Sequence, residues 1–469
     1  MTAGARVTIG GVTIASSWDG SDLIAVSGLR IRWGRDNPYD DPDPSILTLT
    51  LVDRSGTFVS DPARIGQEVT VEMIDPARAM FRGTITGPKA VRARVHNPVE
   101  DADETVWIVT LTASDPVANL GMAVYAGDAP NGTVEGAGGW LEVRPHQRLQ
   151  KLYDAGASGI VAGFDPLPDI VASPPVDRKM HGQSAADART ALELVQQAYR
   201  LHPLGTTGYD PDQNMVKLAQ FAASSPVALT LTAGKITLTL TAGTVIPASA
   251  VAVADYRLES RVDAAIDAVQ VSYWWYGRDP ALTPGTTNVK RTIYTQGFIE
   301  GRTARYDART RRVLKIDTED IIFDPTEFVA GSTDALNRFP AWLLDRVLAI
   351  VNKLNGQLRI PQLTFDARRP LPPAIESIIY RPLASAVPIY FAGSVFNGMD
   401  GVGPMFQMIG GTLTFDGEWS HEVTMCATGP AVPSTLTLPQ LVRPAALTLA
   451  DFDPALSLAD LGLVTIGLP

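Results

Sequence analysis

Apolar and polar residues alternate at a period of two in several short runs between residues 26 and 87. Such alternation puts one face of a strand into a core and the other face into solvent or against a partner. Clusters of Pro, Gly and Asp separate the runs, and these residue types end strands and form turns. Evenly spaced short strands with turns between them predict a small antiparallel barrel or sandwich. The predicted core positions are Leu29, Ile31, Trp33, Leu47, Leu49, Leu51, Val69, Val71 and Met73.

Two flanking runs extend this first predicted domain in both directions. Val7–Ile9 and Val12–Ile14 lie on either side of a glycine pair, which accepts the positive φ of a tight hairpin turn. Residues 105–113 alternate again, and Ser114-Asp115-Pro116 ends that strand. We therefore place the first domain at residues 1–115.

Helix signals appear in the next segment, residues 116–218. Pro145 is suited to the first position of a helix, because its missing N–H costs nothing there. Ser184 and Asp187 resemble a capping box that opens a second helix running to about Arg200. The segment is predicted to be a small α/β domain with about two helices.

Acidic and amide side chains at Asp210, Asp212 and Asn214 resemble the start of a calcium loop. A full calcium loop also needs a glycine at its sharp turn and a glutamate at its end, and both are missing. A turn between two strands is the favoured interpretation. The repeated runs ALTLTAG (228–234) and TLTLTAG (237–243) predict two further strands that pair with each other.

A second barrel is predicted over residues 219–430, and its most informative strand is DAVQVSYWWY at 267–276. Alternation puts Trp274 and Tyr276 on the face opposite Tyr273 and Trp275. Two apolar faces cannot both lie in solvent. Another layer of the same chain can cover the two aromatic rings, or a neighbouring subunit can, since aromatic residues are enriched at interfaces. Both possibilities stay open at this point.

A basic cluster follows in this acidic chain. It consists of Arg302, Arg305, Arg309, Arg311 and Arg312. Such a cluster is either solvated and ion-paired or in contact with an acidic patch of a neighbouring subunit. With Trp274 and Tyr276, the residues Arg305, Arg309, Arg311 and Arg312 are the candidate subunit-interface residues.

Three further features complete the C-terminal half. The apolar run at 340–354 predicts a helix inserted in the second barrel, which Asn355-Gly356 ends. Alternating residues on both sides of Asp416-Gly417 predict a hairpin. Short leucine-rich repeats after residue 430 predict an extended arm at 431–469, because each is too short to bury its own face.

Composition excludes several classes of function. The chain has 469 residues, 39 basic against 50 acidic, and a net charge of −11, so a basic nucleic-acid groove is not expected. A single cysteine, Cys426, excludes an intrachain disulfide and a multi-cysteine zinc site. No apolar run is long enough to span a bilayer.

No catalytic motif is found in the sequence. His421 is interpreted as a packed strand residue, and we expect no enzyme activity, metal or cofactor.

Two sets of motifs resemble a known family. The first is Trp33-Gly34-Arg35, an acidic proline loop, LTLTLVDRSG, IGQEVTVEM and MFRGTITG; the second is Gly410-Gly411 followed by Trp419-x-His421. In this order they resemble the tail-hub proteins of long-tailed bacteriophages, especially minor tail proteins of actinobacterial siphophages. Related barrels occur in the spike bases of contractile secretion systems.

The resemblance implies a mainly β (α+β) fold with two hub-type β-barrels. The residues themselves predict the small α/β domain between the barrels and the extended C-terminal arm, and the loop-rich segment 116–218 and the arm depart from the simplest hub pattern. The resemblance also implies a homotrimer in which six barrels form a ring at the tail tip of the virion. Such a ring ends the tail tube, with a distal tail protein above and further minor tail proteins below, and phage DNA passes through it in transit. The alternative is a distal tail or receptor-binding protein that grips host-surface carbohydrate through aromatic side chains such as Trp274 and Tyr276.

Overall fold

The computed structural model describes the chain in segments that include most of the predicted strands. The described residues are 4–35, 43–60, 64–74, 77–125, 145–164, 179–180, 189–199, 205–220, 227–232, 235–240, 245–246, 252–260, 268–277, 288–299, 302–305, 313–322, 358–366, 386–392 and 405–427. The predicted helix at 340–354 and the predicted arm at 431–469 lie outside them.

The N-terminal strands form an antiparallel sheet whose two ends meet. Their order across the sheet is β3-β4-β7-β6-β5-β1-β2, and an isolated bridge joins Ala15, just after β2, to Ala25 on β3. The predicted leading hairpin is confirmed, with Gly10 and Gly11 both at positive φ in its turn. The strands are β1 (Ala5–Ile9), β2 (Val12–Ile14), β3 (Ile24–Gly34), β4 (Asp43–Asp53), β5 (Glu68–Met73), β6 (Arg78–Asn97) and β7 (Ala102–Ser114), with the short helix α1 (Thr57–Ser60) between β4 and β5.

Period-two alternation places the core of this sheet where the sequence predicts it. The nine apolar residues predicted to face inward are all buried, and none is more than 4% exposed. Burial of each large apolar side chain stabilises the fold by roughly 1.5–3 kcal/mol. The opposite face of β4 and β7 carries threonines that stay partly exposed, as expected for an antiparallel sheet with one solvated face.

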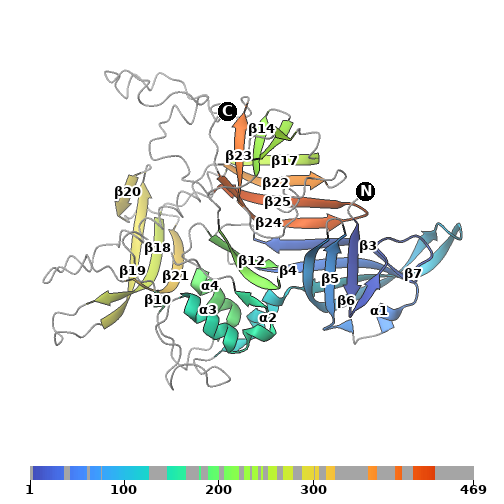
Figure 1. Cartoon of the computed structure of the whole chain (residues 1–469), viewed down its shortest axis with the longest axis horizontal. Coiled ribbons are helices and arrows are strands. Elements are labelled where there is room, and N and C mark those ends of the chain that lie inside the picture. Colours follow the sequence, from blue (N-terminus) through green and yellow to red (C-terminus); the bar gives the residue numbers. More distant parts are fainter. Residues whose placement is uncertain are drawn as a thin grey trace.

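The last strands of the chain continue the first sheet. β24 pairs antiparallel with β3, and β25 pairs with β24, so the orange and blue strands lie side by side in Figure 1. From β24 the sheet branches to β22 and β17 through β25, and to β14, β15 and β16 through β23. These strands are β14 (Val227–Thr232), β15 (Lys235–Leu240), β16 (Val245–Ile246), β17 (Ala252–Ser260), β22 (Leu358–Asp366), β23 (Ala386–Ala392), β24 (Met405–Phe415) and β25 (Trp419–Ala427).

Two predicted hairpins are confirmed in this branch. The repeated Leu-Thr runs form β14 and β15, which pair in register from Val227 with Leu240 to Thr232 with Lys235. The turn at Asp416-Gly417 connects β24 to β25, with Gly417 at positive φ.

A second, five-stranded sheet contains the aromatic strand. Its order is β10-β21-β18-β19-β20, and β18 lies in its centre. The strands predicted to build one barrel at 219–430 therefore belong to two sheets within the described residues, and their closure into a second barrel stays a prediction. The strands are β10 (Lys179–Met180), β18 (Ala268–Gly277), β19 (Asn288–Ile299), β20 (Arg302–Arg305) and β21 (Val313–Ile322).

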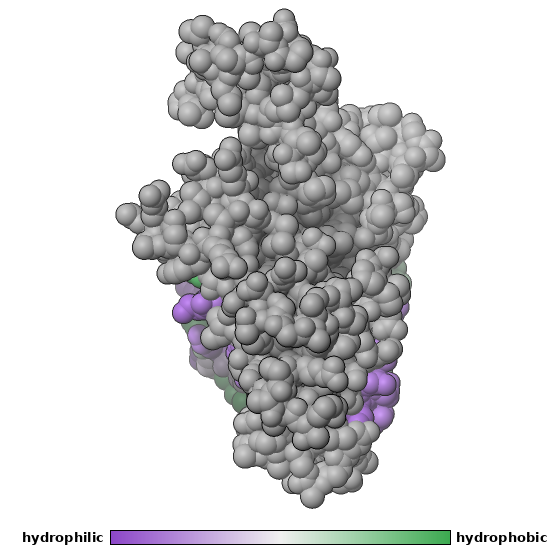
Figure 2. All heavy atoms as spheres, turned by 90° about the vertical axis from the view of Figure 1, so that its left-hand side faces the viewer, coloured by the Kyte–Doolittle hydropathy of each residue, from purple (hydrophilic) through white to green (hydrophobic). Residues whose placement is uncertain are grey.

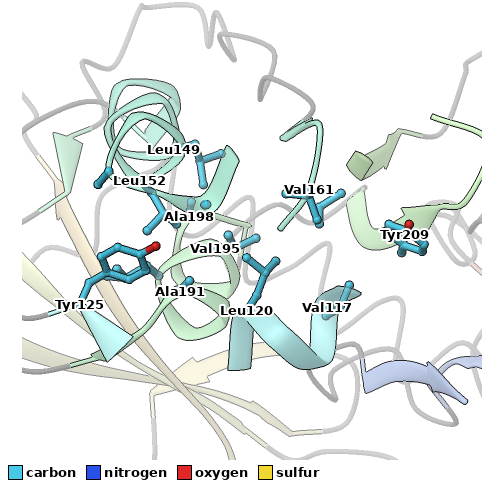
Figure 3. Close-up of a cluster of buried hydrophobic side chains, with 14 of the residues drawn as sticks. Val117, Leu120, Tyr125, Leu149, Leu152, Val161, Ala191, Val195, Ala198 and Tyr209 are labelled. Carbon is cyan, nitrogen blue, oxygen red and sulfur yellow. The ribbon is translucent and has the colours of Figure 1, made fainter. Parts of the chain in front are cut away.

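A helical cluster lies beside these sheets (Figure 1). In Figure 3, Leu120 of α2 and Val195 of α4 point toward each other, and Leu149 and Leu152 of α3 approach from the other side. Met180 of β10 belongs to the same buried cluster, so the helical cluster packs against a strand of the five-stranded sheet. The elements are α2 (Pro116–Met122), β8 (Val124–Tyr125), α3 (Pro145–Asp154), η2 (Ala157–Gly159), β9 (Gly163–Phe164), β11 (Arg189–Thr190), α4 (Ala191–Tyr199), β12 (Gly205–Asp210) and β13 (Met215–Gln220).

The structure corrects the predicted start of the second helix. α4 begins at Ala191, and the preceding residues Arg189–Thr190 are strand β11. The capping box is Thr190 with Glu193: the Thr190 N–H donates to the glutamate, and the Glu193 N–H donates to the Thr190 hydroxyl. The pattern starting at Ser184 was therefore assigned to the wrong residues, since a second Thr-x-x-Glu pattern follows six residues later.

Candidate assembly interface

The N-terminal and C-terminal motifs that carry the family resemblance meet in one buried junction. Trp33 Nε1 on β3 donates a hydrogen bond to His421 Nε2 on β25 over 2.9 Å, and both residues are buried. An indole N–H only donates, so Nε2 of His421 is the unprotonated acceptor nitrogen of a neutral ring. This bond joins positions 388 residues apart.

Glycines allow the strands to approach at this junction. Gly34 has φ +71°, and a Cβ there would lie 2.3 Å from the Ile409 carbonyl oxygen. A Cβ at Gly411 would lie 2.4 Å from the Glu422 carbonyl oxygen and 3.0 Å from Nε2 of His421. A side chain at Gly34 would separate β3 from β24, and one at Gly411 would separate β24 from β25 or displace the Trp33–His421 pair. The two glycine motifs are thus one structural unit, which we call the junction: Trp33, Gly34, Gly410, Gly411 and His421.

A second indole strengthens the same contact between the chain halves. Trp419 Nε1 donates to the Gly4 carbonyl oxygen over 3.3 Å, and the Trp419 ring packs on Phe415 with 5.2 Å between centroids. His421 is therefore a packed residue of a strand, as the sequence predicts. Its hydrogen bond to Trp33 was not predicted, because nothing local in the sequence indicates which distant strand β25 adjoins.

Asp115 connects the N-terminal sheet to the helical cluster. Its carboxylate accepts two backbone hydrogen bonds. One comes from the N–H of Ser45 on β4 at 2.7 Å, and the other comes from the N–H of Val117 at the start of α2 at 3.0 Å. Only 1% of the residue is exposed. Burial raises the pKa of the Asp115 carboxyl to about 7, because removal from water disfavours the charged form.

A small cavity of about 30 Å³ adjoins Asp115 where three parts of the chain meet. Trp33 and Ser45 come from the N-terminal sheet, Val195 and Gln196 from α4, and Ile409 from β24. A water molecule needs roughly 10–15 Å³ of such space, so the cavity has room for about two or three waters.

The β12–β13 turn docks the helical cluster onto β6. Asp212 accepts the Ala79 N–H over 2.7 Å, and the Tyr209 hydroxyl donates to Asn214 over 2.8 Å. Asn214 has φ 51°, typical of asparagine in a tight turn. The predicted turn is confirmed, and it also holds two parts of the fold together. Burial raises the pKa of the Tyr209 phenol, in keeping with its place beside buried Asp115.

Three of the six predicted subunit-interface residues, Trp274, Tyr276 and Arg305, belong to strands of the five-stranded sheet. Positions 274 and 276 are two residues apart on β18 and so share one face by register, and Trp274 is half-buried. Arg305 ends β20 and pairs with Gln296, a register position on the opposite face from 274 and 276. Arg309, Arg311 and Arg312 lie outside the described residues. A subunit contact at these residues stays a prediction.

The described surface offers other contact features. In Figure 2 the coloured side chains at both margins are mainly hydrophilic, with a smaller hydrophobic area on one side. Among the described residues, no three His, Cys, Asp or Glu side chains are grouped as metal ligands, and none of the helices there could cross a bilayer.

Several solved structures are similar to this chain at low sequence identity. The 43 kDa tail protein of prophage MuSo2 from Shewanella oneidensis matches with a TM-score of 0.50 and 11% identity, over 92% of this chain and 99% of that chain. A tail protein from Neisseria meningitidis MC58 matches with a TM-score of 0.48 and 10% identity, over 92% of this chain and 100% of that one. A component of the Escherichia coli type VI secretion system matches with a TM-score of 0.41 and 10% identity, over 94% of this chain and 79% of that chain.

No protein-family model and no curated protein sequence matches the chain. The likeness to the Shewanella protein extends over nearly the whole of both chains. The chain therefore has the mainly β fold of that prophage tail protein, and the likeness at this identity is one of fold.

Proposed function

We propose that the protein is a structural component of the tail tip of a bacteriophage, similar to a baseplate hub or minor tail protein. The observation that carries the proposal is the fold likeness to a prophage tail protein along 92% of this chain and 99% of the other. The two motif sets of the hub family support it independently, because they come from the sequence.

The junction gives this role a physical basis. A tail-tip protein must keep its shape while other proteins attach to it and while the tail is under mechanical stress. Hydrogen bonds between β3 and β24 make one continuous sheet from the first and last described strands, so the halves of the chain cannot separate without breaking a strand pair. No reaction is required for such a role, and we propose a structural function rather than catalysis.

The finer proposal follows the family expectation. Three copies form a ring that ends the tail tube in a virion of the siphophage type, with a distal tail protein above and further minor tail proteins below. DNA passes through the centre of the ring during ejection. The net charge of −11 supports this passage, because like-charge repulsion keeps DNA from adhering to an acidic channel.

Labelling intact particles tests this function. Antibodies raised against the purified chain should decorate the tail tip in electron micrographs, and quantitative mass spectrometry of virions should give three copies per particle. Absence of the protein from purified virions would refute a structural role. Strong binding of the free protein to host-wall glycans, with a position on peripheral fibres, would support the receptor-binding alternative.

A further inference from the structure

Among the strands that the structure describes, none pairs with one edge of the long strand β6 over about half its length. β5 pairs with β6 only between Arg78 and Thr84, whereas β7 pairs with the other edge from Thr84 to Asn97. In the part of the chain that the structure describes, no strand pairs with the first edge beyond Ile85. The N–H and C=O groups directed to that side are thus available to a further strand.

This open edge, residues 86–96 of β6, is accessible. None of its residues is buried, and Val91 is 66% exposed. In Figure 1 the β6–β7 ribbon extends outward from the N-terminal sheet. An unpaired edge of this length is a template for addition of another strand.

The ribbon is held in a fixed shape at its outer end. Asn97, which is fully buried, donates hydrogen bonds to the Gly20 carbonyl over 3.1 Å and to Glu104 over 3.2 Å. Arg54 forms an ion pair with Glu104 at 2.8 Å. Because the ribbon is already ordered, binding of a partner strand would not incur the loss of conformational entropy that ordering the ribbon would cost.

Charge distinguishes β6 from the rest of the molecule. Its 20 residues, RAMFRGTITGPKAVRARVHN, include five Lys and Arg and no Asp or Glu. With these five charges set apart from the total of −11, the remainder of the chain carries −16. The strand is thus basic, and the surface of any other copy is acidic on average.

We propose that the open edge of β6 is the contact through which one copy of this chain binds a second copy. Antiparallel edge-to-edge pairing of two β6 strands centred near Ala93 would bring Arg92 of one copy against Arg94 of the other, and like charges repel. The contact is therefore heterologous, between the basic edge of one copy and an acidic surface of the next, and such contacts form closed rings when the rotation closes. The inference rests on the proposed ring assembly and names one of its contact surfaces.

Hydrogen exchange on the full-length chain tests the location of the contact. At increasing protein concentration the amides of residues 86–96 should gain protection in step with self-association, while amides of the exposed α3 surface should not. Association measured by analytical ultracentrifugation should weaken several-fold between 50 and 300 mM NaCl, because salt screens exposed charges.

Charge reversal tests the mechanism. Arg92→Glu with Arg94→Glu should raise the dissociation constant at least tenfold. Arg92 also stacks on Trp107 at 5.3 Å, so circular dichroism checks the fold, and Arg92→Lys should retain association because it keeps the charge. Lys151→Glu with Arg189→Glu is the matched control: it makes the same charge change in the helical cluster and should leave the dissociation constant within about twofold.

The outcomes separate this inference from the proposed function. Wild-type assembly without protection of residues 86–96, or an unaltered dissociation constant for the Arg92/Arg94 variant, overturns the β6 contact and leaves the tail-tip role standing. In that case Pro88 and the basic residues serve only to keep the edge from pairing. A wild-type chain that stays monomeric at every concentration overturns the β6 contact and the proposed ring, whereas the tail-tip role is decided by the labelling of virions.

Discussion

Trp33 and His421 show how one hydrogen bond determines the protonation state of a buried side chain. The indole of Trp33 can only donate, so the acceptor nitrogen of His421 carries no proton. A histidine on an alternating strand is easily mistaken for a catalytic base. Its buried position and its bond to a tryptophan give it a structural role instead.

Asp115 is the residue at which pH should affect stability. Burial raises its pKa from an ordinary 3.8 to about 7, so the folded chain holds a proton that the unfolded chain releases between these values. The free energy of unfolding should therefore fall as pH rises from about 4 to 7 and change no further above that range. The raised pKa corresponds to about 4 kcal/mol as an upper value.

Asp115→Asn tests this assignment. The amide cannot titrate, and it presents an N–H₂ group to one of the two backbone N–H donors, so the variant should lose about 1–3 kcal/mol at pH 4. The difference from wild type should shrink between pH 4 and 7 in urea denaturation. Asp416→Asn, in the exposed hairpin turn, is the control. A difference that stays constant with pH would contradict the assignment.

At the scale of elements, the glycines of β24 are required by the close approach of its two neighbouring strands, β3 at Gly410 and β25 at Gly411, and not by a turn. A Cβ at Gly411 would lie 2.4 Å from a backbone oxygen that cannot move aside without shifting β25. Gly87 on β6 is a contrasting case, since a Cβ there meets nothing within 4 Å. Close packing thus requires glycine at position 411, whereas the space around position 87 can accept a larger residue.

Gly411→Ala and Gly87→Ala form a matched pair for measurement. We expect Gly411→Ala to lower the free energy of unfolding by about 2 kcal/mol or more, as strained core substitutions do. Gly87→Ala should change it by less than about 1 kcal/mol. Thermal or urea unfolding of both variants checks the contrast; equal effects would mean that the junction adapts to a side chain.

Which elements could be predicted depended on how local their signals are. Alternation within single strands predicted β3, β4 and β5 and their buried residues, because the period is a property of each strand. Helix α2 was missed: Ser114-Asp115-Pro116 was interpreted as the end of a strand, although Asp115 is also a typical N-cap and Pro116 a typical first residue of a helix. The junction could not be predicted, since the sequence contains both motifs but no signal that they touch.

On the scale of the whole molecule, the first and last described strands belong to one sheet. β3 lies between β4 and β24, so its inner face, with Leu29, Ile31 and Trp33, is completed by residues near the end of the chain. The N-terminal sheet is therefore not an independent unit at this edge, although sequence alternation alone predicts a separate first domain at 1–115.

Truncation tests this dependence. A chain that ends at residue 404 lacks β24 and β25, which exposes apolar residues of β3 and leaves that strand with an unpaired edge. We expect most of this variant to aggregate, whereas a chain that ends at Ala427 keeps both strands and should remain soluble. Size-exclusion chromatography of both lysates gives the comparison, and a monodisperse, folded 1–404 chain would contradict it.

The bond between positions 33 and 421 also has a consequence for synthesis in the cell. A ribosome adds roughly 5–20 residues per second, so the 388 residues between the two positions take about 20–80 s to emerge. During that time the edge of β3 that pairs with β24 has no native neighbour, although β4 can already pair with the other edge. Chaperone occupancy on ribosome-bound chains should therefore persist until β24 and β25 leave the exit tunnel.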